Sequence, residues 1–84
     1  MNIAGVVVFA KPQESTGLRT RLSELPGVEV HAVNEEGKLV VTVENEYESE
    51  LADTMMQMQS MSGVLSASMV YHHNENNINV GEQP

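Results

Sequence analysis

Cysteine and tryptophan are absent from this 84-residue sequence, and aromatic residues are scarce, with one Phe and two Tyr. Without cysteine the chain has neither disulfides nor thiolate metal ligands, so its core must be stable without covalent support. Basic residues are also few: four Lys and Arg stand against twelve Asp and Glu, a formal net charge of -8. A chain so acidic and so poor in aromatic residues lacks the basic, stacking surface that RNA-binding sheets use. We therefore expect no nucleic-acid partner.

Long hydrophobic runs are missing as well. No apolar run approaches the ~20 residues needed to cross a bilayer, and the sequence begins without a basic leader region or a small-residue cleavage site. We therefore expect a cytoplasmic protein that does not insert into membranes. The strong negative charge either favours a basic partner or simply keeps a small protein in solution, and the second explanation is the more common one.

Four apolar segments have the length and composition of β-strands: Ile3–Ala10, Val28–Val33, Leu39–Glu44 and Val64–Tyr71. The third is almost wholly aliphatic or β-branched, which is typical of an interior strand. An Asn-Glu-Glu-Gly turn at 34–37 returns the chain antiparallel from the second strand into the third. From His73 onward Asn, Glu, Gly and Pro predominate, so we expect one domain over residues 1–73 and a disordered tail over residues 74–84.

Two helices are expected between these strands. The first begins near residues 12–15 and ends at the Pro-Gly pair at 26–27. Its apolar face consists of Leu18, Leu22 and Leu25. The second begins at Asn45, which together with Glu48 resembles a capping box, and it ends before Gly63. Its apolar stripe, which should cover the sheet, consists of Tyr47, Leu51, Met55, Met58 and Met61.

The element order β-α-β-β-α-β contains a weak internal duplication. Leu-Pro-Gly-Val at 25–28 and Met-Ser-Gly-Val at 61–64 each close a helix and open a strand. Two right-handed β-α-β units combine into a ferredoxin-like α+β fold. This fold has a four-stranded antiparallel sheet in the order 4-1-3-2 and two helices on one face. The other face of the sheet is then left without a helical cover.

Strand register decides which residues lie on the face without helices. If the two halves of the duplication match in space, this face carries Ala4, Val6, Val8, Glu29, His31, Val40, Thr42, Glu44, Leu65, Ala67, Met69 and Tyr71. Simple alternation in the last strand predicts the opposite there, with Leu65, Ala67 and Met69 in the core and Ser66 and Ser68 outside. The sequence leaves both registers open, and we adopt the first. An apolar face with acidic residues beside it indicates an interaction site, unless the tail or a second copy of the chain covers it.

No arrangement of residues indicates catalysis. The hydroxyl-bearing residues are scattered, and there is no glycine-rich phosphate loop. His31 and His72 lie on opposite edge strands of the predicted sheet, three strand spacings of ~4.8 Å or roughly 14 Å apart. Metal ligand bonds of ~2 Å do not allow such a pair to share one ion. We therefore expect no enzyme activity, no cofactor and no metal site.

Three segments resemble the NapD family. They are Leu-Pro-Gly-Val-Glu-Val at 25–30, Gly-Lys-Leu-Val-Val-Thr-Val-Glu at 37–44, and Gly-Val-Leu at 63–65 leading to Ser-Met-Val-Tyr-His at 68–72. The likeness covers about residues 3–74 in order, and Met69 and Thr42 are mild departures from the family pattern. Members of this family are small cytoplasmic maturation chaperones of periplasmic nitrate reductase.

The resemblance implies a binding protein that holds the twin-arginine signal peptide of the nitrate reductase catalytic subunit in the cytoplasm. It delays export until the molybdenum cofactor is inserted. Such a peptide has two arginines followed by an apolar stretch, which suits an acidic domain with an apolar sheet face. The residues expected to bind it are Val6, Val8, Val40, Leu65 and Met69 for the apolar side, Glu29 and Glu44 for the arginines, and Thr42.

Two further interpretations come from other functional classes. One is a regulatory domain of the same fold that binds a small effector and dimerises through its sheet. It would need a glycine-rich strand-to-helix loop, and only Gly17 stands near that position. The other is a structural dimerisation domain. We expect a monomer or weak dimer, although the sequence does not fix the oligomeric state.

Overall fold

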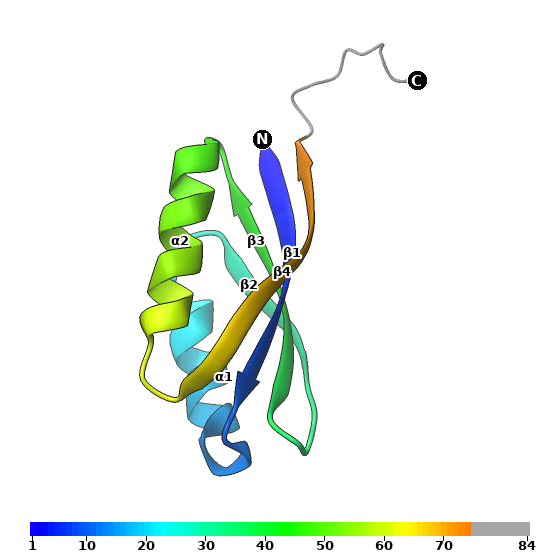
Figure 1. Cartoon of the computed structure of the whole chain (residues 1–84), viewed down its shortest axis with the longest axis vertical. Coiled ribbons are helices and arrows are strands. Elements are labelled where there is room, and N and C mark those ends of the chain that lie inside the picture. The colour runs from blue at the N-terminus through cyan, green and yellow to red at the C-terminus, as the bar shows by residue number, and fades with distance from the viewer. Residues whose placement is uncertain (75–84) are drawn as a thin grey trace.

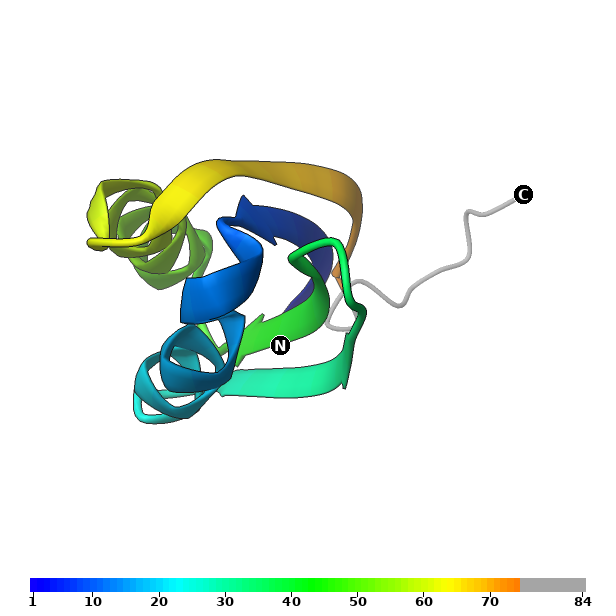
Figure 2. The same ribbon diagram turned by 90° about the horizontal axis from the view of Figure 1, so that it is seen from below.

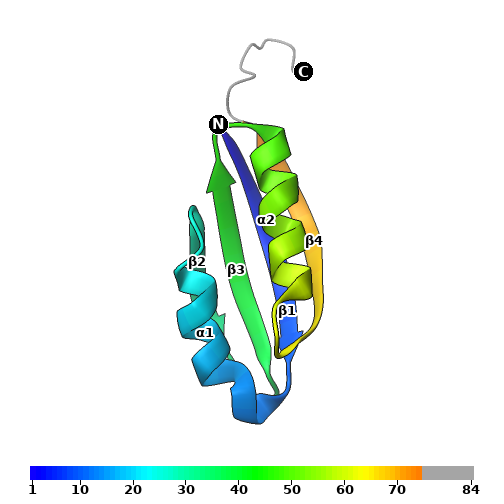
Figure 3. The ribbon, with the colours of Figure 1, turned by 90° about the vertical axis from the view of Figure 1, so that its left-hand side faces the viewer.

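The computed structural model describes residues 1–74. Its elements are β1 (Asn2–Ala10), the 3-10 helix η1 (Pro12–Glu14), α1 (Ser15–Ser23), β2 (Val28–Val33), β3 (Lys38–Asn45), α2 (Glu48–Ser60) and β4 (Val64–Asn74). The strands form one antiparallel sheet in the order β2-β3-β1-β4, and Figure 1 shows this sheet on one side of the two helices. Both helices lie on the same face of it, α1 beside β2 and α2 toward β4 (Figure 3). The predicted ferredoxin-like fold and its strand order are confirmed.

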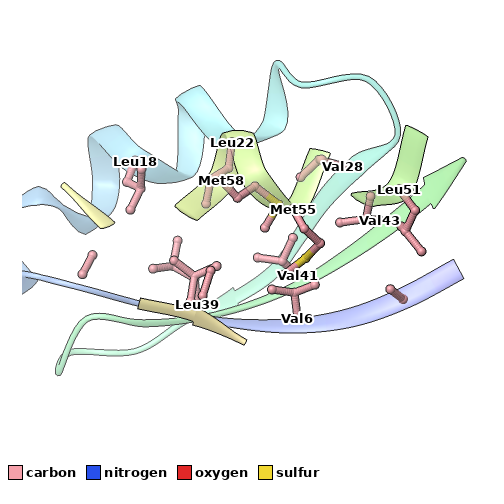
Figure 4. Packing of buried hydrophobic residues seen from close by; sticks show 14 residues of the cluster. Val6, Leu18, Leu22, Val28, Leu39, Val41, Val43, Leu51, Met55 and Met58 are labelled. Atoms are coloured by element: carbon pink, nitrogen blue, oxygen red, sulfur yellow. The ribbon is translucent and has the colours of Figure 1, made fainter. Parts of the chain in front are cut away.

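The hydrophobic core fills the space between the helices and one face of the sheet (Figure 4). Leu18 and Leu22 of α1, one helical turn apart, are fully buried. The opposing layer consists of every second residue of the two central strands: Ala4, Val6, Val8 and Ala10 of β1, and Leu39, Val41 and Val43 of β3. Burying each Val or Leu side chain contributes about 1.5–3 kcal/mol, so this layer is the main source of stability.

The two helix-to-strand junctions are built alike, as the internal duplication predicts. Gly27 and Gly63 have φ of 80° and 95°, a left-handed conformation that glycine adopts without steric cost. In each junction the first residue of the new strand donates its N–H to a carbonyl three residues back, from Val28 to Leu25 and from Val64 to Met61, both at 3.1 Å. The duplication is therefore a repeated turn that ends a helix and aims the chain into the sheet.

Helix α2 begins later than predicted. Asn45 is the last residue of β3 and pairs with Asn2 of β1, so it is not available as the helix cap. Its side-chain amide instead donates to the hydroxyl of Thr54 at 3.4 Å, and no side chain caps the first turn of α2. Tyr47 is 63% exposed, so its predicted core position was also wrong. The rest of the stripe packs as expected, with Met61 partly buried beside the buried Leu51, Met55 and Met58.

Strand β4 continues beyond its predicted end at Tyr71. It runs to Asn74, which pairs with Asn2 and therefore belongs to the sheet. The other residues of the expected tail, 75–84, lie outside the described residues. Neither helix within residues 1–74 combines the length and the hydrophobicity of a membrane-spanning segment.

Candidate functional site

The sheet face turned away from the helices, which we call the open face, consists of four cross-strand rows. Directly paired residues on neighbouring strands point to the same side of a sheet. We number the rows from the start of β1 to its end. Row one is Glu44, Ile3 and His73, and row two is Glu29, Thr42, Gly5 and Tyr71. Row three is Ala32, Val40, Val7 and Ser68, and row four is Lys38, Phe9 and Ser66. Figure 2 shows both helices on one side of the curved sheet, and within residues 1–74 no helix covers the other side.

Rows three and four hold an apolar cluster. Phe9 is 44% exposed and Val40 is 40% exposed, while Val7 between them is half-buried. Serines of β4 and Lys38 of β3 surround this cluster. An apolar cluster rimmed by polar side chains on the surface of a small domain indicates a place where another molecule binds.

Rows one and two hold both acidic residues of the open face. Glu44 and Glu29 are exposed and lie on neighbouring strands. Thr42, which pairs with Glu29, is hydrogen-bonded through its hydroxyl to Nε2 of His31 at 2.7 Å. His31 is the extra residue at a register shift in β2, which allows its ring to reach the neighbouring strand. This end of the face therefore combines two carboxylates with a hydroxyl and an imidazole that hydrogen-bond each other.

Tyr71 covers Gly5 at the centre of row two. A Cβ atom built on Gly5 would overlap the tyrosine ring, so the ring lies against the backbone of β1. Half of the Tyr71 side chain nevertheless remains exposed. Glycine within a strand often marks a place where another group approaches the backbone closely. Gly5 in an otherwise apolar strand is thus the sequence signal that could have located this part of the face.

The structure contradicts the expected position of Val6 and Val8. Their side chains are 1% and 0% exposed and pack in the core beneath the helices, as Figure 4 shows for Val6. They pair with Val41 and Leu39, which also face the helices, and Ala4 follows the same pattern. These residues therefore do not belong to the open face. Val7 and Phe9, which sequence reasoning missed, take their place.

The register adopted for the last strand was also wrong. Ala67 is buried in the core, and Met69 pairs with Val6, which puts it on the helix side although it is 42% exposed. Ser66 and Ser68 lie on the open face instead. This is the arrangement that simple alternation in β4 predicts.

Two irregularities in β4 decide the remaining positions. β4 has a bulge opposite residues 9 and 10 of β1, where Leu65 has no pairing partner on β1. Leu65 is 64% exposed, so it belongs neither to the core nor to the rows of the open face. A second shift makes Val70 the extra residue and returns Tyr71 to the open face, where it was expected. Of the residues predicted to bind a peptide, Glu29, Val40, Thr42 and Glu44 lie together on the open face, whereas Val6, Val8 and Met69 do not.

Other parts of the described surface offer less. Within residues 1–74 no three His, Cys, Asp or Glu side chains are grouped so that they could hold a metal ion. His72 lies on the helix side of β4 and its Nε2 is 3.2 Å from Oδ1 of Asn2. A hollow between α2 and β4 is lined by Glu48, Leu51, Ala52, Met69 and His72. It is one alternative to the open face as a binding surface, beside a second hollow lined by Pro26, Asn45, Glu50, Asp53, Thr54 and Gln57.

Comparisons with known proteins identify the family. The family model described as NapD protein matches residues 1–76. Chaperone NapD of Escherichia coli strain K12 is 37% identical over 75 residues, which cover 87% of this chain and 85% of that protein. Chaperone NapD of Paracoccus pantotrophus is 32% identical over 71 residues, covering 84% and 62% of the two chains.

A solved structure agrees with this assignment. The solution structure of the E. coli Tat proofreading chaperone protein NapD has a TM-score of 0.79 and 32% sequence identity, and the match covers 98% of this chain and 85% of that one. NapD proteins are chaperones and not enzymes. This chain belongs to the NapD family of chaperones.

Proposed function

We propose that this chaperone binds the twin-arginine signal peptide of the periplasmic nitrate reductase catalytic subunit on its open face. One observation carries the proposal: the uncovered face of the sheet combines an exposed apolar cluster with two exposed carboxylates. A peptide with two arginines followed by an apolar stretch complements both features. The relative from E. coli, a Tat proofreading chaperone, supports this class of ligand.

Binding takes place in the cytoplasm and delays export until the molybdenum cofactor has been inserted. A signal peptide that lies on the chaperone is not free for the export machinery. The fraction withheld depends on the chaperone concentration relative to the dissociation constant. The timing of release then depends on the dissociation rate of the peptide.

The two kinds of side chain have different roles in this binding. Phe9, Val7 and Val40 bury apolar area against the apolar part of the peptide, and such contacts mainly set the dissociation rate. Glu29 and Glu44 are exposed, and an exposed ion pair contributes only about 0.2–1 kcal/mol at equilibrium. They mainly accelerate association and make it dependent on salt.

Calorimetric titration of the full chain with the signal peptide tests this function. We expect binding that weakens when both arginines of the peptide are changed to glutamine. Phe9→Ala should weaken binding at least tenfold, because it removes the largest side chain of the apolar cluster in rows three and four. Met56→Ala is the matched control, since Met56 is 64% exposed on α2 and remote from the open face in the fold.

Two results would contradict the proposal. One is no heat of binding at high peptide concentration. The other is equal weakening by the Phe9 and Met56 variants, which would move the site away from the open face. Sedimentation of the chaperone alone addresses the dimer interpretations: a tight dimer that buries the open face would leave no surface for a peptide.

A further inference from the structure

The acidic and the apolar residues of the open face lie toward opposite ends of the strands. Both acidic residues, Glu29 and Glu44, lie in rows one and two. Rows three and four contain no acidic residue, and row four contains the basic residue Lys38. Lys38 and Glu44 stand at opposite ends of β3, six residues or roughly 20 Å apart. Within the strands, the face therefore has an acidic end and an apolar end with one positive charge, while Glu35 and Glu36 lie beyond row four in the turn between β2 and β3.

We infer that the bound signal peptide runs parallel to β1, with its arginine pair over rows one and two and its apolar stretch over rows three and four. This inference rests on the proposed function and adds the direction of the peptide. In this direction the arginines lie beside Glu29 and Glu44, and the apolar stretch lies on Phe9, Val7 and Val40.

The opposite direction is unfavourable for two reasons. It brings the arginines beside Lys38, and like charges at a contact reduce affinity. It also lays the apolar stretch over Glu29 and Glu44, which removes water from carboxylates without giving them a partner. Lys38 thus disfavours the reversed orientation of the peptide, while Glu29 and Glu44 favour the inferred orientation.

Tyr71 determines the preference for arginine within this arrangement. Its ring is held against Gly5 in the same row as Glu29 and Thr42, and half of the side chain is exposed. A guanidinium group is planar, so it stacks on an aromatic ring while it donates hydrogen bonds to a carboxylate. The ammonium group of lysine has no such planar fork. Tyr71 lies on β4, three strand spacings from Glu29 on β2, so its ring stacks on one guanidinium of the pair and leaves Glu29 for the other. This stacking selects arginine over lysine at this end of the peptide.

Paramagnetic broadening measures the direction directly. The protein contains no cysteine, so a nitroxide attached to a cysteine at one end of the signal peptide is the only spin label in the complex. A label at the N-terminal end should broaden the amide signals of Ile3, Glu44 and His73. A label at the C-terminal end should broaden those of Phe9, Lys38 and Ser66.

The outcomes separate this inference from the proposed function. The direction would be overturned if the N-terminal label broadened the signals of row four and the C-terminal label those of row one, or if each label broadened both rows equally. Peptide binding on the open face would then still stand. Broadening confined to the hollow between α2 and β4 would overturn both the direction and the site. Absence of binding would overturn the proposed function itself.

A charge exchange tests the physical cause of the direction. The double variant Glu44→Lys with Lys38→Glu keeps the net charge, and both positions are exposed, so the fold is not at risk. We expect the two labelled peptides to lose their distinct broadening patterns or to exchange them. Patterns identical to those of the unaltered protein would overturn the role of these charges.

The role of Tyr71 is tested with a peptide in which both arginines are replaced by lysine. The unaltered protein should bind this peptide several-fold more weakly than the arginine peptide. In Tyr71→Leu that ratio should fall toward one, and in the conservative Tyr71→Phe it should be retained, because the ring is kept. A ratio that Tyr71→Leu leaves unchanged would overturn the assignment.

Discussion

Replacing Val8 by threonine tests the observed register of β1 without changing the shape of the side chain. Val8 is fully buried, and its partners on the neighbouring strands, Leu39 and Ala67, are buried apolar residues. The change removes one buried methyl group, about 0.8 kcal/mol, and leaves a hydroxyl without a hydrogen-bond partner, roughly 1–3 kcal/mol. We expect the free energy of unfolding to fall by about 2–4 kcal/mol. This is a large part of the about 4–13 kcal/mol typical of a domain of this length.

The neighbouring residue provides a matched control, because Val7 is chemically identical and lies on the opposite face of the same strand. Val7 is half-buried on the open face, so the hydroxyl of Val7→Thr reaches water and stability should change by less than ~0.5 kcal/mol. Urea unfolding followed by circular dichroism measures both variants, with unchanged denaturant slopes. Equal losses in the two variants, or a larger loss in Val7→Thr, would refute the register and with it the composition of the open face.

Four further outcomes follow from the packing and the charges. Gly27→Ala should destabilise the fold by more than about 1 kcal/mol, because Gly27 has φ of 80° and a Cβ there would clash with the carbonyl oxygen of Glu44. Gly17→Ala should stabilise it by up to ~1 kcal/mol, because this position in α1 has open space around it; thermal unfolding of the two variants should give shifts of opposite sign. Leu18→Ala should cost about 2–5 kcal/mol in urea unfolding, and a loss below 1 kcal/mol would contradict its full burial in the core. Raising salt from 0.1 M to 1 M shortens the Debye length from ~10 Å to ~3 Å; stopped-flow mixing with the signal peptide should show slower association, and Glu44→Gln should reduce this salt dependence.

The fold was predictable because its main signals are local. Helical spacing placed Leu18 and Leu22 on a buried face, and the aliphatic third strand was correctly assigned to the interior of the sheet. The two Gly-Val junctions revealed the duplication, since each needs a residue with positive φ at the end of a helix. These features fixed the element order, and the β-α-β handedness rule then left one sheet order.

The open face was harder to predict because β1 carries no alternation, and because the alternation of β4, which is correct from Ser66 to Met69, was set aside for the register of the internal repeat. Residues 3–10 are apolar throughout, so the periodicity of two that separates the faces of a strand is invisible in β1. Val6 and Val8 were therefore assigned to the wrong side. In β4 the bulges at Leu65 and Val70 interrupt the alternation. The first half of the internal repeat has no bulge at the matching positions, so it could not predict them.

The β3 residues of the open face were predicted correctly for the opposite reason. Leu39, Val41 and Val43 are buried, and Val40, Thr42 and Glu44 alternate with them without interruption. Pairing with β3 then determines which residues of β1 share its open side. The error was to align β1 by the repeat and not by its antiparallel partner. The register of a strand is defined relative to the strand it pairs with, so it follows from the pairing in three dimensions and not from an internal sequence repeat.

The most direct test of peptide binding on the open face is an amide NMR titration of the labelled chain with the twin-arginine signal peptide, compared with the peptide in which both arginines are glutamine. The account predicts that the largest shift changes occur at Phe9, Val40, Thr42, Glu44 and Tyr71. They should be smaller with the altered peptide, most of all at Glu44. Shift changes confined to α2 and the hollow beside β4, with the open face unaffected, would contradict the account.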